Sequence, residues 1–299
     1  MTLEFHTPAL TDRDAAAAAA NACHARENDV SFVNLYLLRR KYGTEIAFHD
    51  GFLLRRYRAG IRAGCYGFPV GTGDLPAALH LMQADAAVQN HPFRMTLLTQ
   101  EQCRILAEIA PDAYDFAPME SYTEYLYRRE SLAFLRGTKY HGKRNHIAQF
   151  WRAYPDAEIQ PLIAENVQFA LEIEQKWLGA RSNPEEPSLL AERDAIEEAA
   201  ADWEALGLTG LLLYADGKPV GMTAVSEISA GVCDIHFEKV APGYPHAWSV
   251  VTNEMAKCLR GAEFLNREED LGETGMRASK QSYHPDLLIE KYTATRKEI

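Results

Sequence analysis

The alternation of hydrophobic and polar positions in the first half of the chain predicts helices mixed with antiparallel strands. Residues 30–71 form short apolar runs that are broken at Tyr42-Gly43 and again at Asp50-Gly51. Asp-Gly between two apolar runs favours a hairpin, so we expect a β-meander in this segment. The other elements predicted here are an alanine-rich helix over 11–27, a helix over 74–89, a strand over 93–99, a helix over 99–110 and extended chain over 114–130.

The second half repeats this pattern with different residues. Its central feature is a hairpin predicted around Asp216-Gly217. The other predicted elements are a helix after Gly142, a strand over 157–162, helices over 164–179 and 188–207, a strand over 231–240, a helix over 245–261, a strand over 263–266, a short helix over 274–282 and a last strand over 287–295.

Each half therefore runs helix, three-strand meander, helix, strand, helix, strand. This order predicts an α/β fold class with mixed α+β sheets, built from two tandem domains over 1–130 and 131–299. It is also the element order of the acetyltransferase-like (GNAT) fold.

Composition narrows the function classes. A chain of 299 residues with 47% hydrophobic content can bury a large core, and a net charge of -11 argues against a general nucleic-acid or anionic-membrane binder. Five scattered cysteines without a CxxC pair indicate reduced thiols and no zinc cluster. With no signal-peptide pattern and no apolar run of transmembrane length, we expect a cytoplasmic protein without a transmembrane segment.

The strand "CDIHFEKV" (233–240) carries the first candidate chemistry. Strict alternation places Asp234, His236 and Glu238 on one face. Asp234 or Glu238 then binds an amine or serves as a general base, unless the strand lies at an edge and shows these residues to water. His236 and Glu238 also suggest a metal pair, but two ligands are too few, and we expect no metal and no required cofactor.

Two further segments bear on a donor or an acceptor. The turn "KVAPGYPHAWSVV" (239–251) offers one glycine and two prolines, and proline supplies no N–H, so it is a poor cradle for the pyrophosphate of CoA. The segment "LRGTKYHGKRNHI" (135–147) contains four basic residues and no acid. It is either a solvated helix start or a seat for phosphate on a nucleotide, a lipid head group or the end of a tRNA.

Five segments together resemble bacterial proteins that share the C-terminal domain of phosphatidylglycerol lysyltransferases. They are "LRGTKYHGKRNHIAQF", "GLTGLLLYADGKPVGMT", "DIHFEKV", "FLNREEDLGETGMRASKQSYHP" and "IEKYTA". The resemblance implies a tandem GNAT-like fold, related to that of the Fem aminoacyltransferases. It also implies the transfer of an amino acid from aminoacyl-tRNA to a lipid head group.

The resemblance also implies roles for particular residues. Lys280 falls on the first lysine of the family's C-terminal motif, while Ser282 replaces the second, and Phe237 stands where the family's strand motif has arginine. Lys280 or Arg277 would stabilise the oxyanion formed during amide synthesis. The candidate catalytic residues are Lys280, Asp234 and Glu238, and the candidate binding residues are Arg277, Lys139, Lys143, Arg144, Asn266, Arg267, Glu268 and Tyr283.

Within this scheme the ammonium of an aminoacyl group has three possible partners, Asp234, Glu238 and Glu268, and Arg267 pairs with a neighbouring acid to hold its loop. The whole charged run 267–280 can also be read as a salt-linked loop that supports the last strand.

Three functions remain open from sequence. The first is a transferase that moves an aminoacyl or acyl group, with aminoacyl-tRNA as a possible donor and a small molecule or lipid head group as acceptor. The second is an acyl-CoA N-acyltransferase that acts on a small amine or amino acid. The third is a non-catalytic protein that binds an anionic ligand.

Overall fold

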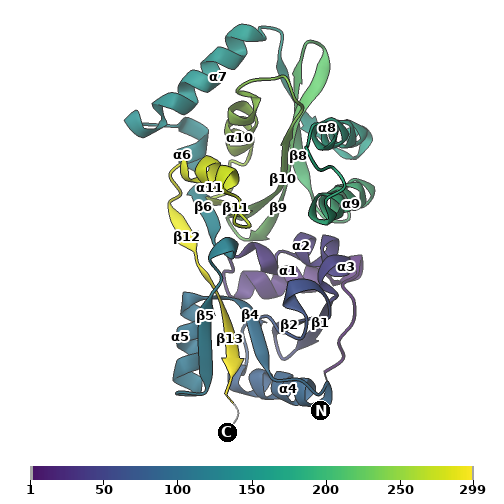
Figure 1. The fold of residues 1–299 in the computed structure, drawn as a ribbon, viewed down its shortest axis with the longest axis vertical. Coiled ribbons are helices and arrows are strands. Elements are labelled where there is room, and N and C mark those ends of the chain that lie inside the picture. The colour runs from purple at the N-terminus through teal and green to yellow at the C-terminus, as the bar shows by residue number, and fades with distance from the viewer. Residues whose placement is uncertain (1–2, 298–299) are drawn as a thin grey trace.

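The computed structural model describes residues 3–297 as a mixed α/β protein (Figure 1). The helices are α1 (Arg13–Ala22), α2 (Phe32–Leu37), α3 (Arg39–Tyr42), α4 (Leu75–Val88), α5 (Gln100–Ile109), α6 (Arg129–Phe134), α7 (His141–Ala153), α8 (Gln168–Gly179), α9 (Pro187–Ala201), α10 (Ala247–Cys258) and α11 (Thr274–Gln281). The strands are β1 (Thr44–His49), β2 (Phe52–Tyr57), β3 (Val70–Gly71), β4 (Arg94–Thr99), β5 (Tyr114–Pro118), β6 (Glu124–Arg128), β7 (Glu158–Leu162), β8 (Thr209–Ala215), β9 (Lys218–Ser229), β10 (Val232–Val240), β11 (Phe264–Glu269), β12 (Leu287–Ile289) and β13 (Lys291–Arg296).

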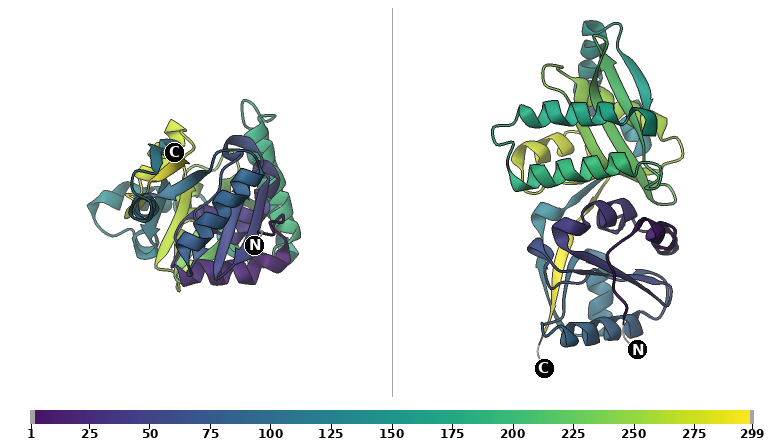
Figure 2. Two further views of the ribbon diagram at one scale, coloured as in Figure 1. Left: turned by 90° about the horizontal axis from the view of Figure 1, so that it is seen from below. Right: turned by 90° about the vertical axis from the view of Figure 1, so that its right-hand side faces the viewer.

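The strands form one large sheet and two small ones. The large sheet has the order β12-β6-β11-β10-β9-β8-β7 and is antiparallel except for the β10–β11 pair. Helices α8 and α9 pack near one face of it, and α6, α7 and α10 lie on the other (Figures 1 and 2). The small sheets, β1-β2-β3 and β4-β13-β5, lie in the other half of the molecule.

The sheets draw strands from both ends of the chain. β6 lies before residue 130 in sequence but pairs with β11 and β12 of the large sheet. β13 crosses in the opposite direction and pairs with β4 and β5 (Figure 1). The chain therefore passes twice between the halves, while the domain division at residue 130 stays a prediction.

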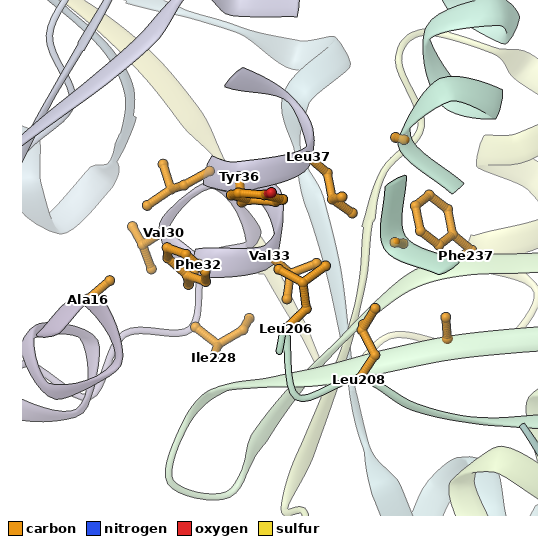
Figure 3. Close-up of a cluster of buried hydrophobic side chains, with 14 of the residues drawn as sticks. Ala16, Val30, Phe32, Val33, Tyr36, Leu37, Leu206, Leu208, Ile228 and Phe237 are labelled. Atoms are coloured by element: carbon orange, nitrogen blue, oxygen red, sulfur yellow. The ribbon is translucent and has the colours of Figure 1, made fainter. Parts of the chain in front are cut away.

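A continuous hydrophobic cluster joins the two halves. Phe32 and Leu37 of α2 pack in the same cluster as Leu206, Leu208 and other residues of the second half (Figure 3). Burial of large apolar side chains stabilises such an interface by about 1.5–3 kcal/mol for each residue. This contact holds α2 against the large sheet, so that its polar residue Asn34 contacts Asp234 and His236 of β10.

Most predicted elements are present, with two corrections, of which the first is that the last strand, predicted over 287–295, is divided into β12 and β13 of different sheets. Both Asp-Gly hairpins form, and the predicted helix over 99–110 begins at a capping box of Thr99 and Gln102. Residues 32–42, however, are helical rather than the first strand of a meander. Five of the six residues of α2 are buried, so its sequence lacks the 3.6-residue polar–apolar period that reveals a surface helix.

No helix within residues 3–297 combines the length and the apolar character that crossing a membrane requires.

Candidate functional site

The site lies where two neighbouring parallel strands stop pairing. β10 and β11 pair only at three positions, from Val232 with Phe264 to Asp234 with Asn266. Both strands continue past this point, β10 to Val240 and β11 to Glu269. We call the place where the pairing ends the β10–β11 fork. Beyond the fork, both strands are still extended and hold their side chains in place. Their backbone N–H and C=O groups no longer pair with each other there.

An irregularity in β10 decides which side chains meet at the fork. The pairing of β10 with β9 shifts between Ile235 and Phe237, so His236 is an extra residue in the strand. Asp234 and His236 consequently contact Asn34 of α2, whereas Glu238 accepts a hydrogen bond from Thr252 of α10 on the opposite face. The expectation that all three share one face is therefore wrong for Glu238, because a β-bulge reverses the alternation after it.

Glu268 reaches the same place through a second irregularity. The pairing of β11 with β6 shifts between Asn266 and Glu269, and Glu268 adopts a left-handed conformation with φ of 55°. The Glu268 amide donates to Asn266 Oδ1 at 2.8 Å, which holds this turn of the backbone. A non-glycine residue in this region is strained by about 1–3 kcal/mol, and such strain concentrates at functional sites.

Asp234, His236 and Glu268 form what we call the acidic cluster. Asn34 Nδ2 donates to Asp234 Oδ2 at 3.0 Å and to Glu268 Oε1 at 2.9 Å, while His236 Nδ1 lies 3.2 Å from Asn34 Oδ1. Asp234 is fully buried, and its Oδ1 has no hydrogen-bond partner within the described chain. The carboxyl groups of Asp234 and Glu268 thus accept hydrogen bonds from the same amide, and Asp234 Oδ1 could accept a further one.

Burial controls the charge of this cluster. Burial, with the Glu268 carboxylate as the second cause, raises the pKa of Asp234 well above its usual range. Burial and then Glu269 raise the pKa of Glu268 to about 8. Burial lowers the pKa of His236 to about 3, so the imidazole is neutral at physiological pH. The cluster therefore favours any ligand that brings positive charge.

Lys280 lies next to this cluster, in the last turn of α11. Its Nζ donates to the backbone carbonyl of Glu269, at the end of β11. Burial lowers the pKa of Lys280, and the carboxylate of Glu268 opposes that shift most strongly. The sequence-predicted residues Lys280, Asp234 and Glu268 are thus brought together.

The face that carries α10 has a basic character instead. Arg267 Nη2 lies 2.7 Å from Glu238 Oε2, and Arg267 Nη1 has no hydrogen-bond partner among residues 3–297. Lys143 Nζ stands 3.8 Å from the centre of the buried Tyr283 ring. Burial, and then the charge of Arg267, lowers the pKa of Lys143 to about 8. Arg267 does pair with an acid, but the partner is on β10 rather than in its own loop.

Of the remaining predicted binding residues, three contact neighbouring side chains or backbone carbonyls, and the fourth is exposed. Arg277 pairs with Asp270 at 2.8 Å, and Arg144 donates to the Leu135 and Gly137 carbonyls. Lys139 is exposed beside the Tyr140 ring, at 5.0 Å. Asn266 donates to Glu124 and to the Arg26 carbonyl. A direct role for these residues in binding a ligand stays a prediction.

Sequence reasoning missed the partners that α2 and β9 supply. Asn34 lies 200 positions from Asp234 along the chain, and Ser226 Oγ stands 2.7 Å from His236 Nε2. The one available signal was a lone asparagine inside the apolar run "SFVNLYLL", since a polar residue buried among apolar neighbours needs a partner.

A separate cavity of about 480 Å³ lies where β10 runs into α10. Its lining includes Trp177, Arg181, Tyr244 and Trp248. Pro242 and Pro245, the two prolines of the turn 239–251, also line it, and they leave fewer N–H groups for a pyrophosphate than a glycine-rich turn would.

The raised pKa of Glu268 predicts a specific pH dependence of stability. Because the native carboxyl holds its proton up to about pH 8, rather than near its ordinary 4.5, unfolding releases a proton between these values and stability falls as pH rises through them. We expect Glu268→Gln to be more stable than the parent at pH 8 by about 1–2 kcal/mol, and the difference to shrink at pH 5. Urea unfolding at both pH values in metal-free buffer measures this, and a parallel shift of both proteins with pH would contradict it.

The two α/β halves, joined through shared strands, define a tandem GNAT-like protein. A tandem GNAT protein from the clavulanic acid biosynthesis pathway superposes with a TM-score of 0.50 at 13% identity, and the match covers 99% of both chains. Residues 21–295 match the family described as "Phosphatidylglycerol lysyltransferase, C-terminal", and the chain belongs to this family. Membership indicates a transferase.

Two solved structures extend the family assignment. A conserved protein of unknown function from Bacteroides thetaiotaomicron is 35% identical, with a TM-score of 0.95 over 99% of this chain and 100% of that one. The C-terminal domain of a putative lysylphosphatidylglycerol synthetase from Agrobacterium fabrum is 14% identical, with a TM-score of 0.66 over 97% and 92% of the chains.

Among curated proteins, an uncharacterised protein of Mycoplasmoides gallisepticum is 29% identical over 179 residues. That match spans 58% of this chain and 56% of the relative, so it covers only about half of each protein.

Proposed function

We propose that this protein transfers an aminoacyl group from aminoacyl-tRNA to an amine or hydroxyl acceptor, and so forms an amide or an ester. The observation that carries the proposal is the β10–β11 fork, where Asp234 and Glu268 converge beside Lys280. Family membership supports the reaction class, and the charges at the fork support the particular donor.

Each group at the fork has a role in this reaction. Asp234 and Glu268 lose their protons as the ammonium of the aminoacyl group binds, and the burial of Asp234 and partial burial of Glu268 strengthen the ion pairs that form. The acceptor attacks the ester carbonyl, and the ammonium of Lys280 stabilises the oxyanion that forms. Collapse of this intermediate breaks the bond to the ribose oxygen of the tRNA, which leaves with the proton that the attacking amine or hydroxyl loses. Glu238 is already bound by Arg267 and Thr252, so it acts as a positioning residue.

The basic face suits an acceptor that carries a phosphate. Lys143 and Nη1 of Arg267, which has no hydrogen-bond partner among the described residues, offer positive charge on the side of the sheet opposite the acidic cluster. A phosphodiester, such as that of a lipid head group, would complement them.

The second candidate is an acyl-CoA N-acyltransferase that acts on a small amine. The GNAT-like fold and the 480 Å³ cavity at the start of α10 favour it. The two prolines in that loop weaken it.

Parallel transfer assays test these alternatives. The purified protein is supplied with charged tRNA and phosphatidylglycerol vesicles in one series, and with acetyl-CoA and a set of free amines in the other. We expect a product only in the first series, detected as aminoacylated lipid by mass spectrometry. Turnover only with acetyl-CoA would establish the second candidate. Failure of both series, together with an anion retained on the purified protein, would indicate a non-catalytic binding protein.

A further inference from the structure

We propose that Asp234, His236 and Glu268 form a binding site for a divalent transition-metal ion. From the sequence, His236 and Glu238 were the candidate metal ligands, and two ligands are too few for a metal site. The fold replaces Glu238 with two carboxylates that the bulges at His236 and Glu268 bring to the same point.

The distances among the three ligand atoms suit a metal centre. His236 Nδ1 lies 3.5 Å from Asp234 Oδ2 and 3.9 Å from Glu268 Oε1, and all three atoms lie within 4.8 Å of one another. Ligands bound at about 2.1 Å in a tetrahedral arrangement are separated by roughly 3.4 Å. The two distances from His236 exceed this spacing by about 0.1 and 0.5 Å, while the two carboxylate oxygens, which lie within 4.8 Å of each other, must approach by up to about 1.4 Å to close the site around an ion.

The surroundings supply the support that a metal-binding histidine needs. His236 Nε2 lies 2.7 Å from Ser226 Oγ, so the ring can donate its proton there once an ion replaces the present contact of Nδ1 with Asn34 Oδ1 and takes the Nδ1 lone pair. The Asn34 amide, at 3.2 Å from Nδ1, offers its oxygen as a fourth ligand.

A second observation points to a ligand independently of these contacts. Asp234 Oδ1 is fully buried and has no hydrogen-bond partner in the described chain. A buried carboxylate oxygen left unpaired is costly, by about 1–3 kcal/mol or more. An ion bound by Asp234 would neutralise this group and the neighbouring Glu268 together.

The donor set narrows the kind of ion. One imidazole nitrogen and two carboxylates favour Zn²⁺, Mn²⁺ or Fe²⁺ over the oxygen-only sites that Ca²⁺ and Mg²⁺ prefer. The site shares its carboxylates with the proposed ammonium site, so a metal ion and an aminoacyl group exclude each other. His236 distinguishes metal binding from ammonium binding, because the metal ion needs the imidazole as a ligand and the ammonium does not.

Direct binding measurements on the full chain test the site without any transfer assay. Protein stripped with a chelator is titrated with Mn²⁺, followed by electron paramagnetic resonance, and with Co²⁺, followed by its visible absorption. We expect one ion for each chain and no intense sulfur-to-cobalt band, since the free cysteines are not ligands. His236→Gln and Glu268→Gln should each weaken binding about 10- to 100-fold.

Exposed residues of the same types give matched controls. His80→Gln and Glu108→Gln lie on the surface of other helices and should bind like the parent. Glu268 is partly exposed, so Glu268→Gln remains informative if His236→Gln fails to fold, and circular dichroism checks both. Less than a tenth of an ion for each chain, or equal binding by Glu268→Gln and the parent, would overturn the metal site. Neither result bears on transfer, which Lys280 variants test separately.

Discussion

We expect Lys280→Ala to lower the rate of transfer by about 10²- to 10³-fold while the protein stays folded. A single group that stabilises a developing oxyanion contributes a factor of this size, because it acts in a site from which water is largely excluded. Lys280 has 9% of its surface exposed and donates to the Glu269 carbonyl at the fork, so its ammonium is already held in place. The rate is measured with the donor and acceptor that the parallel assays identify.

Two comparisons separate a catalytic role from a structural one. Lys257→Ala removes a half-exposed lysine from α10 and should leave the rate unchanged. Circular dichroism and thermal melting of Lys280→Ala should show a folded protein with a melting temperature only a few degrees lower. Unchanged turnover in a folded Lys280→Ala protein would remove Lys280 from the mechanism.

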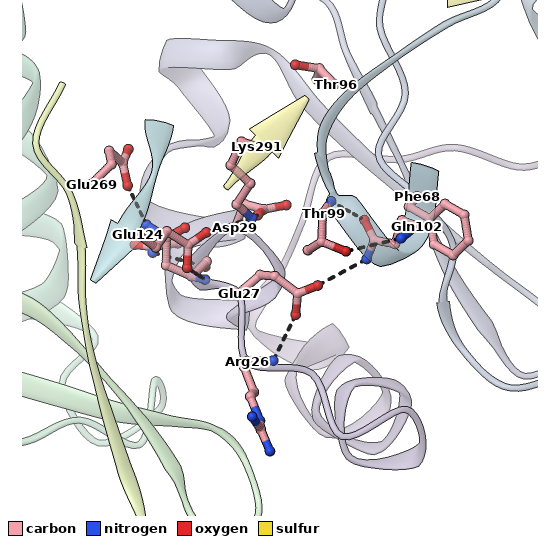
Figure 4. A network of polar contacts seen from close by, with 12 residues as sticks. Arg26, Glu27, Asp29, Phe68, Thr96, Thr99, Gln102, Glu124, Glu269 and Lys291 are labelled. Atoms are coloured by element: carbon pink, nitrogen blue, oxygen red, sulfur yellow. Dashed lines mark hydrogen bonds and ion pairs between the residues drawn. The ribbon is translucent and has the colours of Figure 1, made fainter. Parts of the chain in front are cut away.

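Lys291→Met destabilises the whole protein, by about 3–5 kcal/mol. Lys291 Nζ lies 2.5 Å from Asp29 Oδ1 and 2.6 Å from Glu124 Oε1, and all three side chains are nearly fully buried (Figure 4). Removing the ammonium leaves Glu124 without a cation and Asp29 with only Arg55. The loss should be large because Lys291 begins β13, Asp29 precedes α2 and Glu124 begins β6, so these residues join both halves.

Urea unfolding monitored by fluorescence measures the effect, and a double variant tests its cause. If the uncompensated carboxylate is the reason, Glu124→Gln should be less damaging in the Lys291→Met background than alone in the parent. Lys297→Met removes an exposed lysine six residues further along and should change stability by about 0.5 kcal/mol or less. Simple additivity of Lys291→Met and Glu124→Gln would contradict the proposed network.

Local sequence predicted the elements whose signals are local. The Asp-Gly turns at 50–51 and 216–217 require left-handed backbone that Asp and Gly accept, and both hairpins form there. The helix predicted over 74–89 forms as α4, and Asp74 caps it by accepting from the Ala77 amide. The helix over 32–37 was missed, since burial on nearly every side removes the period that distinguishes a helix from a strand.

The residues of the candidate site could be predicted from the sequence, but their arrangement could not. Sequence identified Asp234, Glu268 and Lys280 as residues of interest, through the polar strand, the charged run and the family resemblance. Their grouping depends on the two bulges, because each shifts the alternation of side chains by one position. A bulge arises from the fit of a strand to its neighbours and leaves no reliable mark in the strand's own residues.

The sequence by itself determined the fold class, the tandem order of elements, the family and the charged segments from which the site is drawn, because turns, caps and hydrophobic periods act over a few neighbouring residues. Only the tertiary structure decided that Asn34 joins Asp234 and Glu268, that Glu238 faces α10, and that Lys291 connects the halves. These contacts bring together residues up to about 260 positions apart. Their physical reason is that buried polar groups must find partners wherever the packed backbone places them.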